Sequence, residues 1–195
     1  MVTTHLFDIV ARVSEVLADL ERPWGLVGGL AVSVYVEPRF TRDIDIAISV
    51  SDDQDAEDFM SAWRTRGFVI DAVIEQDETE RLATVRTYRP SSEKGIVVDL
   101  LFASSGIESE IANQAREMTI VPGLTIPVAR PGHLFALKLL SFDPDTRPLD
   151  LVDIQNLTDL MNKKERAAAQ RAVQLIEERG FDRGRDLSTL MDDHL

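Results

Sequence analysis

The 195-residue sequence contains no cysteine, so a disulfide framework and a thiolate metal site are excluded. Only three histidines occur, His5, His133 and His194, and they are far apart in the chain. Their separation argues against a zinc site and, with the lack of a Gly-x-Ser-x-Gly motif, against a serine hydrolase. The sequence also has no Gly-x4-Gly-Lys-Ser/Thr loop and no dinucleotide-binding glycine pattern.

Positive charge is scarce as well. The formal net charge is −13, which predicts a soluble protein with no general attraction to nucleic acid or to an anionic membrane. The longest largely apolar run, residues 25–36, is too short to span a bilayer. The first ten residues, MVTTHLFDIV, lack the basic and apolar regions of a signal peptide. We therefore predict a cytoplasmic location and no membrane partner.

Hydrophobic periodicity predicts a mixed α/β (α+β) protein. Up to residue 130 the pattern favours helices over 4–21, 30–37, 52–67 and 106–117, strands over 24–27, 43–50, 68–74, 81–88 and 95–102, and a strand pair or loop over 118–129. From Pro131 onward, the segments 131–141, 148–161 and 163–180 fit the helical period. We expect a mixed-sheet core with an N-terminal helix over 1–130, and a C-terminal helical region over 131–195 that packs on it.

The segment DIDIAISV, residues 43–50, alternates strictly between apolar and small or acidic side chains. In a strand, Asp43 and Asp45 then point to the same side, about 6–7 Å apart. In a partly desolvated site two such charges repel by about 2–3 kcal/mol, a cost that protonation or a bound cation would remove. For an isolated Asp-x-Asp, the alternative is an amphipathic strand with one solvated face.

Two further features change this interpretation. Gly28 and Gly29 follow a short apolar strand and precede a helix, which would let backbone N–H groups approach phosphate. Asp99 interrupts the apolar strand GIVVDLLFA, where an unpaired carboxylate is costly. Three acids that converge from neighbouring strands would suit Mg²⁺, which prefers oxygen ligands. The alternatives are a generic glycine turn and a strand aspartate on a solvated face.

The segment GGLAVSVYVEPRFTRDIDI resembles the first motif of the DNA polymerase β-like nucleotidyltransferase superfamily, and Asp99 in VDLLF resembles its third-carboxylate strand. Within this superfamily the chain is most similar to the AbiEii-like toxins, in which a helix bearing a lysine precedes an Arg…Asp-x-x-Asp segment. The corresponding residues are Lys138, Arg147, Asp150 and Asp153. The resemblance covers roughly residues 24–161. It departs from the family pattern at Gly29, where many members have serine, and at His133, where relatives often carry an acid.

This resemblance implies a nucleotidyltransferase fold and a Mg²⁺- or Mn²⁺-dependent enzyme that uses a nucleoside triphosphate (NTP). The metal ligands would be Asp43, Asp45 and Asp99, and the catalytic residues would be these three acids and Lys138. The nucleotide-binding set would be Gly28, Gly29, Arg39, Arg42, Lys138, Arg147, Asp150 and Asp153. Alternatively, Lys138 is a solvated helix lysine, the Arg147 group is an ordinary helix-start charge set, and the two loop arginines only offset nearby acids.

The resemblance also implies an acceptor hydroxyl on an RNA 3′ end such as that of tRNA, on a protein or on a small molecule, and a toxin with an antitoxin partner. An RNA acceptor would need a basic rim on an otherwise acidic surface, for which the candidates are Arg39, Arg42, Arg81, Arg86, Arg89, Lys138 and Arg147. Two other functions are open, a catalytically silent member of the fold that binds a partner and a Mg²⁺-dependent phosphohydrolase.

Overall fold

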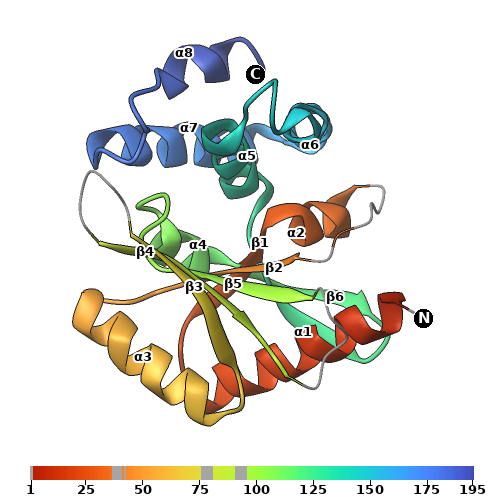
Figure 1. Cartoon of the computed structure of the whole chain (residues 1–195). Coiled ribbons are helices and arrows are strands. Elements are labelled where there is room, and N and C mark those ends of the chain that lie inside the picture. Colours follow the sequence, from red (N-terminus) through yellow and green to blue (C-terminus); the bar gives the residue numbers. More distant parts are fainter. Residues whose placement is uncertain (1, 37–40, 42, 76–80, 91–95) are drawn as a thin grey trace.

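The structure of the protein, a computed structural model, describes residues 2–36, 41, 43–75, 81–90 and 96–195 (Figure 1). Its helices are α1 (Val2–Asp19), α2 (Gly28–Tyr35), α3 (Asp53–Thr65), α4 (Glu108–Gln114), α5 (Pro131–Ser141), α6 (Pro148–Leu160), α7 (Lys163–Glu178) and α8 (Leu187–Asp192). Its strands are β1 (Trp24–Val27), β2 (Asp43–Ile48), β3 (Val69–Glu75), β4 (Leu82–Tyr88), β5 (Val97–Leu101), β6 (Arg116–Val121) and β7 (Leu124–Val128).

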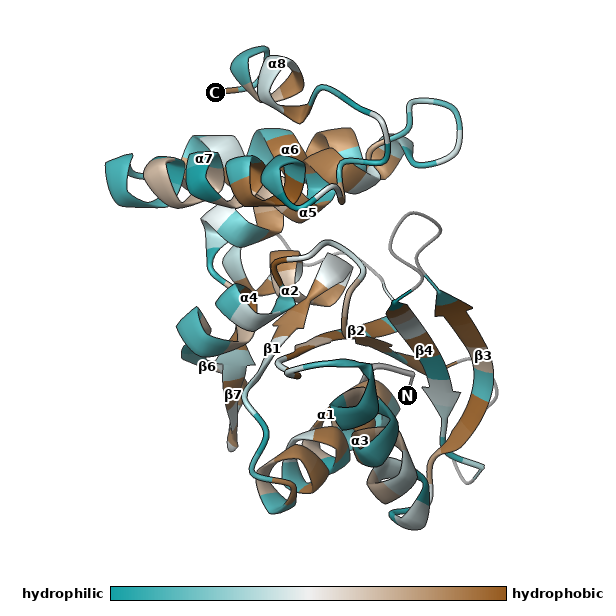
Figure 2. Ribbon diagram, turned by 90° about the vertical axis from the view of Figure 1, so that its left-hand side faces the viewer, coloured by the Kyte–Doolittle hydropathy of each residue, from teal (hydrophilic) through white to brown (hydrophobic). Residues whose placement is uncertain are grey.

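The strands form one mixed sheet in the order β3-β4-β5-β2-β1-β7-β6. Strand β2 runs parallel to β5 and antiparallel to β1, and β1 runs parallel to β7. Helices α1 and α3 cover one face, whereas α2, α4 and the C-terminal helices lie on the other, as both views show (Figures 1 and 2). The predicted α/β class is therefore confirmed.

The alternation in β2 decides which residues face which layer. Ile44, Ile46 and Ile48 are fully buried in the main core, so the alternate positions Asp43 and Asp45 project to the opposite face. Burial of apolar strand residues fixes the register, because a slip by one residue would send both carboxylates into the core. The sheet thus presents its acids towards the C-terminal helices.

Helix α5 is held against both the sheet and α7. A Cβ on Gly132 would lie within 3.0 Å of three atoms of the segment Glu165–Ala169, so only glycine permits this close crossing. The buried Glu165 carboxylate accepts hydrogen bonds from the Gly132 amide at 3.3 Å and from the Arg130 guanidinium at 3.2 Å, and it also pairs with Arg116 of β6. These contacts fix the helical layer over the acidic face of the sheet.

Several predicted boundaries differ from the structure. Helix α2 begins at Gly28 itself, since its φ of 66° lets the turn and the helix start coincide. The helix predicted over 106–117 is shorter, because the chain enters β6 at Arg116. The segment 118–129, for which a strand pair or a loop was predicted, forms most of the β6–β7 hairpin. Helix α8 was not predicted. The predicted boundary after residue 130 coincides with the start of α5, and the division into two domains stays a prediction.

In the part of the chain that the structure describes, no helix is both long and apolar enough to cross a membrane.

Candidate active site

One cavity of about 530 Å³ lies between the sheet and the C-terminal helices. The sheet and its loops contribute Gly28, Gly29, Thr41, Asp43, Asp45, Arg86, Asp99, Leu101, Ser104 and Ser105. The C-terminal region contributes Lys138, Ser141, Thr146, Arg147, Asp150 and Arg183, together with apolar residues of α5 and α6. The three acids predicted from the sequence therefore line one space, in which Asp45 and Asp99 are register partners on the parallel strands β2 and β5.

The glycine pair forms one wall of this cavity. A Cβ on Gly28 would lie within 3.0 Å of three atoms of the Asp45 side chain, and its φ of 66° is unfavourable for other residues. Glycine at this position therefore lets the start of α2 approach the Asp45 carboxylate. The residue before the helix, Val27, provides no side-chain cap, so the first amides of α2 are oriented as at an anion-binding helix N-terminus.

Asp45 is electrostatically strained. Its burial raises its pKa to about 7, the negative charges of Asp99 and Asp43 add to this effect, and the positive charges of Lys138 and Arg147 oppose it. Close to neutral pH the metal-free protein therefore holds Asp45 in a mixture of protonated and ionised forms. A cation placed between these carboxylates would favour the ionised form.

Asp99 is buried but paired. Arg86 on the neighbouring strand β4 is its register partner and donates from Nε to Oδ1 at 2.9 Å and from Nη2 to Oδ2 at 2.7 Å. This bidentate pair explains how Asp99 is accommodated in an apolar strand, and the same contact raises the pKa of Arg86 further. From the sequence, Arg86 belongs only to a general basic set, because the register of β4 against β5 cannot be read from the chain.

The donor set fits a hard cation in chemistry, since three carboxylates line one cavity and repulsion burdens Asp45. Within the described ranges, however, no three acidic or histidine side chains are gathered closely enough to form a metal site. Both oxygens of Asp99 are bonded to Arg86. The metal-binding roles of Asp43, Asp45 and Asp99 therefore stay a prediction.

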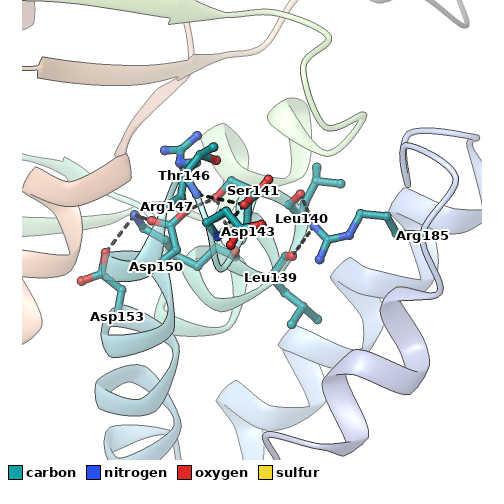
Figure 3. Close-up of polar contacts among 11 residues, drawn as sticks. Leu139, Leu140, Ser141, Asp143, Thr146, Arg147, Asp150, Asp153 and Arg185 are labelled. Atoms are coloured by element: carbon teal, nitrogen blue, oxygen red, sulfur yellow. Dashed lines mark hydrogen bonds and ion pairs between the residues drawn. The ribbon is translucent and has the colours of Figure 1, made fainter.

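A second charged cluster joins α5 to the start of α6 (Figure 3). The buried Lys138 ammonium lies 2.6 Å from Asp150 Oδ1 and 2.8 Å from Asp153 Oδ2. The other Asp150 oxygen accepts from the Ser141 hydroxyl at 2.7 Å and pairs with Arg147 Nε at 3.1 Å. Lys138 thus lines the cavity while its charge is balanced by two aspartates, whereas the Arg147 side chain remains 55% exposed. The nucleotide-binding roles of Lys138, Arg147, Asp150 and Asp153 stay a prediction.

The other predicted cations lie elsewhere. Arg81 pairs with Asp53 at 3.2 Å, and Arg89 lies over the Phe68 ring, so neither lines the cavity. Arg39 and Arg42 fall outside the described residues.

Two residues of the C-terminal region differ in whether they line the cavity. His133 is buried in α5 and does not line the cavity, and its burial and the nearby Arg130 lower its pKa to about 4. Arg183, from the connection between α7 and α8, does line the cavity. No pattern in the sequence predicts Arg183 in the site, because the expected helical tail does not indicate that this loop returns to the acids.

The fold is shared with several solved structures. An antigenic nucleotidyltransferase-like protein from Paracoccidioides brasiliensis is 18% identical, with a TM-score of 0.55 over 95% of this chain and 91% of the other. The solution structure of the antibiotic-resistance factor ANT(2″)-Ia is 11% identical, with a TM-score of 0.58 over 100% and 98% of the two chains. ANT(2″)-Ia in complex with adenylyl-2″-tobramycin is 12% identical, with a TM-score of 0.53 over 87% and 97%.

A comparison with curated proteins finds no match to the sequence. The family described as nucleotidyl transferase AbiEii toxin, type IV TA (toxin–antitoxin) system, matches residues 12–194. This range extends beyond the segment 24–161 that carried the sequence resemblance, and it includes α7 and α8. Because the match spans nearly the whole chain, the protein belongs to the AbiEii family of nucleotidyl transferase toxins.

Proposed function

We propose that the protein transfers a nucleoside monophosphate from an NTP to an acceptor hydroxyl, with Mg²⁺ or Mn²⁺ held by Asp43, Asp45 and Asp99. The observation that carries this proposal is the single cavity in which these three carboxylates face the glycine-rich start of α2. Carboxylates suit the metal, and helix N-terminal amides suit the phosphates.

The acceptor oxygen attacks the α-phosphorus, the bond from that phosphorus to the oxygen bridging the β-phosphate breaks, and pyrophosphate leaves. Asp99 accepts the hydroxyl proton as the new bond forms. The amides of Gly28 and Gly29 and the exposed Arg147 guanidinium bind the negative phosphate oxygens. The divalent cation, when bound, neutralises the charge that builds up on the leaving pyrophosphate.

Arg86 sets a condition on this role of Asp99. Its guanidinium occupies one acceptor site on each carboxylate oxygen and repels a second cation, so a metal bound to Asp99 would compete with Arg86 for these oxygens. The Arg86 side chain is 43% exposed and lines the cavity, so it has room to turn towards a bound phosphate. Arg86 thereby becomes a second positive group for the substrate.

The charges favour an acceptor that places only a small group in the cavity. Among the described residues predicted to form a basic rim, Arg86, Lys138 and Arg147 line the cavity, and each is paired with a carboxylate. An RNA 3′ end, a protein hydroxyl and a small-molecule hydroxyl all meet this condition, whereas a long RNA footprint does not. From the family we propose a toxin role, with an antitoxin as protein partner.

The test is incubation with each α-labelled NTP and a cell lysate, with Mg²⁺, with Mn²⁺ or with EDTA. Metal-dependent transfer of label with release of pyrophosphate supports the proposal, and Asp43→Asn should abolish it. Asp71→Asn, an exposed aspartate on β3, is the matched control. Release of inorganic phosphate would instead indicate a phosphohydrolase, and NTP binding without turnover would indicate a silent binding protein. Transfer that persists in EDTA would refute the metal role.

A further inference from the structure

The connection between α7 and α8 brings an arginine from the C-terminal end of the chain to the cavity. Arg183 lines the same space as the three aspartates, although it is separated from them by more than 80 residues in sequence. The segment that carries it, FDRGRD at residues 181–186, has a defined backbone and is fixed at several points.

Arg183 has an unfavourable backbone conformation. Its φ is 59°, and that of Gly184 is 68°. The Arg185 amide donates to the Asp182 carbonyl at 3.2 Å, and the Gly184 amide donates to Asp182 Oδ1 at 2.9 Å. Two central residues with positive φ are the pattern of a type I′ turn, in which Asn, Asp or Gly is normally found at the first central position. An arginine there is disfavoured by its Cβ, so its side chain is the feature that needs an explanation.

The loop is anchored on both sides of the cavity. Arg185 Nη1 donates to the carbonyl oxygens of Leu139 and Leu140 at 3.2 and 2.9 Å, at the end of α5 (Figure 3). On the sheet side, the Phe181 ring packs so closely on Gly106 that an added Cβ would lie 2.5 Å from it. These contacts pre-organise the Arg183 backbone before any ligand binds.

Arg183 lies at the end of the cavity opposite to the glycine pair. Its Nη2 group is 3.5 Å from the Ser104 carbonyl oxygen, beyond the carboxyl end of β5. Gly28 follows the carboxyl end of β1, which is antiparallel to β2, while β2 is parallel to β5. The two sites therefore flank the acids from opposite ends of the strands.

The charges that line the cavity indicate what the Arg183 guanidinium could bind. Four positive residues, Arg86, Lys138, Arg147 and Arg183, and four aspartates, Asp43, Asp45, Asp99 and Asp150, line it, so their formal charges cancel. The nearest acid along the β5–α4 loop, Glu108, is buried and accepts from the amides of Ser104 and Ser105 and from the Ser105 hydroxyl. An anionic ligand group next to Ser104 would meet Arg183 first.

We propose that Arg183 is a phosphate-binding residue that serves the end of the cavity remote from Gly28 and Gly29. The inference rests on the proposed function, because it takes the substrates to be phosphate-bearing. The phosphate could belong to the nucleotide or to the acceptor, and the two sources share the recognition chemistry, a guanidinium fork on phosphate oxygens.

The test compares Arg183→Gln and Arg183→Gly with Lys164→Gln, which removes the same charge from an exposed position on α7. Binding of each NTP with Mg²⁺, of pyrophosphate and of a single-stranded RNA 12-mer is measured by calorimetry at about 100 mM salt. Both Arg183 variants should lose about 5–20-fold in affinity for at least one probe, while Lys164→Gln stays within about twofold. Loss with NTP and pyrophosphate assigns Arg183 to the nucleotide, and loss confined to RNA assigns it to the acceptor.

The glycine variant separates binding from folding. Arg183→Gly relieves the positive φ, so its melting temperature should equal or exceed that of the wild type while its affinity falls. Glu21→Gly is the matched control, because Glu21, with φ of 51°, is the other non-glycine residue with positive φ in the described ranges, and it does not line the cavity. It should raise the melting temperature without changing affinity.

Affinities of both Arg183 variants equal to wild type for every probe would overturn the inference and leave the proposed function intact. An equal loss in Lys164→Gln would also overturn it, because the effect would then be one of general charge. A wild-type protein that binds none of the probes would overturn the inference and the proposed function together.

Discussion

Replacement of Asp45 by asparagine should stabilise the metal-free protein. The Asp45 pKa is about 7 in the folded state against 3.8 for an unperturbed aspartate, a difference of about 3 units. At 1.36 kcal/mol per unit, ionisation of Asp45 costs the folded protein at most about 4 kcal/mol at high pH. Because the carboxylate keeps some contact with solvent, we expect Asp45→Asn to gain about 1–3 kcal/mol of unfolding free energy at pH 8.

The sign of the pH dependence follows from the direction of the shift. Between pH 4 and pH 7 the folded protein retains a proton on Asp45 that the unfolded chain releases, so the wild type loses stability as pH rises through this window. The asparagine variant has no such titration. The difference between the two proteins should therefore be close to zero at pH 4 and reach its full size above pH 7.

Urea unfolding in EDTA at several pH values measures this difference, with Asp71→Asn as a control that should stay within about 0.5 kcal/mol of the wild type. If Asp45 binds Mg²⁺ as proposed, the order should reverse in excess Mg²⁺, because the variant would lose a ligand for a cation that stabilises the folded state. A pH-independent loss of stability in Asp45→Asn would show that the carboxylate has a structural role, and the electrostatic reasoning would then be refuted.

Three further substitutions probe the site and its support. Gly28→Ala should cost about 2–5 kcal/mol of unfolding free energy, because the new Cβ overlaps the Asp45 side chain, whereas Gly123→Ala, with φ of 86° and open space around it, should cost only about 1 kcal/mol. Lys138→Met should destabilise by about 3–5 kcal/mol in urea titrations, since it leaves two buried aspartates without their cation. In the wild type, the lowered His133 pKa should cost up to about 3 kcal/mol of unfolding free energy as pH falls from 6.5 to 4. His133→Gln removes this titration, so its unfolding free energy should fall less over the same pH range. An equal fall in the two proteins would contradict this.

The residues that could be predicted from the sequence are those whose pattern is local. The alternation DIDIAISV determines which side of β2 carries Asp43 and Asp45, because one face of the strand is buried and the register cannot slip. The glycine pair was predicted to be a turn before a helix, whereas it forms the first turn of α2, and the reason for glycine there, the approach to Asp45, depends on the tertiary structure. Asp99 was singled out because an acid in an apolar strand needs a partner.

The partners themselves depend on strand register and on loops. Arg86 meets Asp99 only because β4 pairs with β5 at that register, and no sequence pattern specifies it. Arg183 reaches the cavity only because Arg185 and Phe181 fix the connection between α7 and α8. Lys138 was predicted in the cavity, but its burial against Asp150 and Asp153 depends on how α5 packs on α6. Such long-range ion pairs are the part of the site that periodicity cannot supply.

The cancelling charges of the cavity connect these contacts to the proposed reaction. Without ligands, Arg86 balances Asp99 and the Lys138 cluster balances itself, so the repulsion remains concentrated on Asp45 and its neighbour Asp43. A triphosphate alone would add negative charge to this neutral cavity, and divalent cations alone would have to compete with Arg86 for Asp99. If a triphosphate and a divalent cation enter together, each offsets the electrostatic cost of binding the other. Arg86 can then turn from the Asp99 carboxylate to a phosphate group. If the protein binds metal and nucleotide as proposed, this linkage is reciprocal, so each should raise the affinity for the other by the same factor.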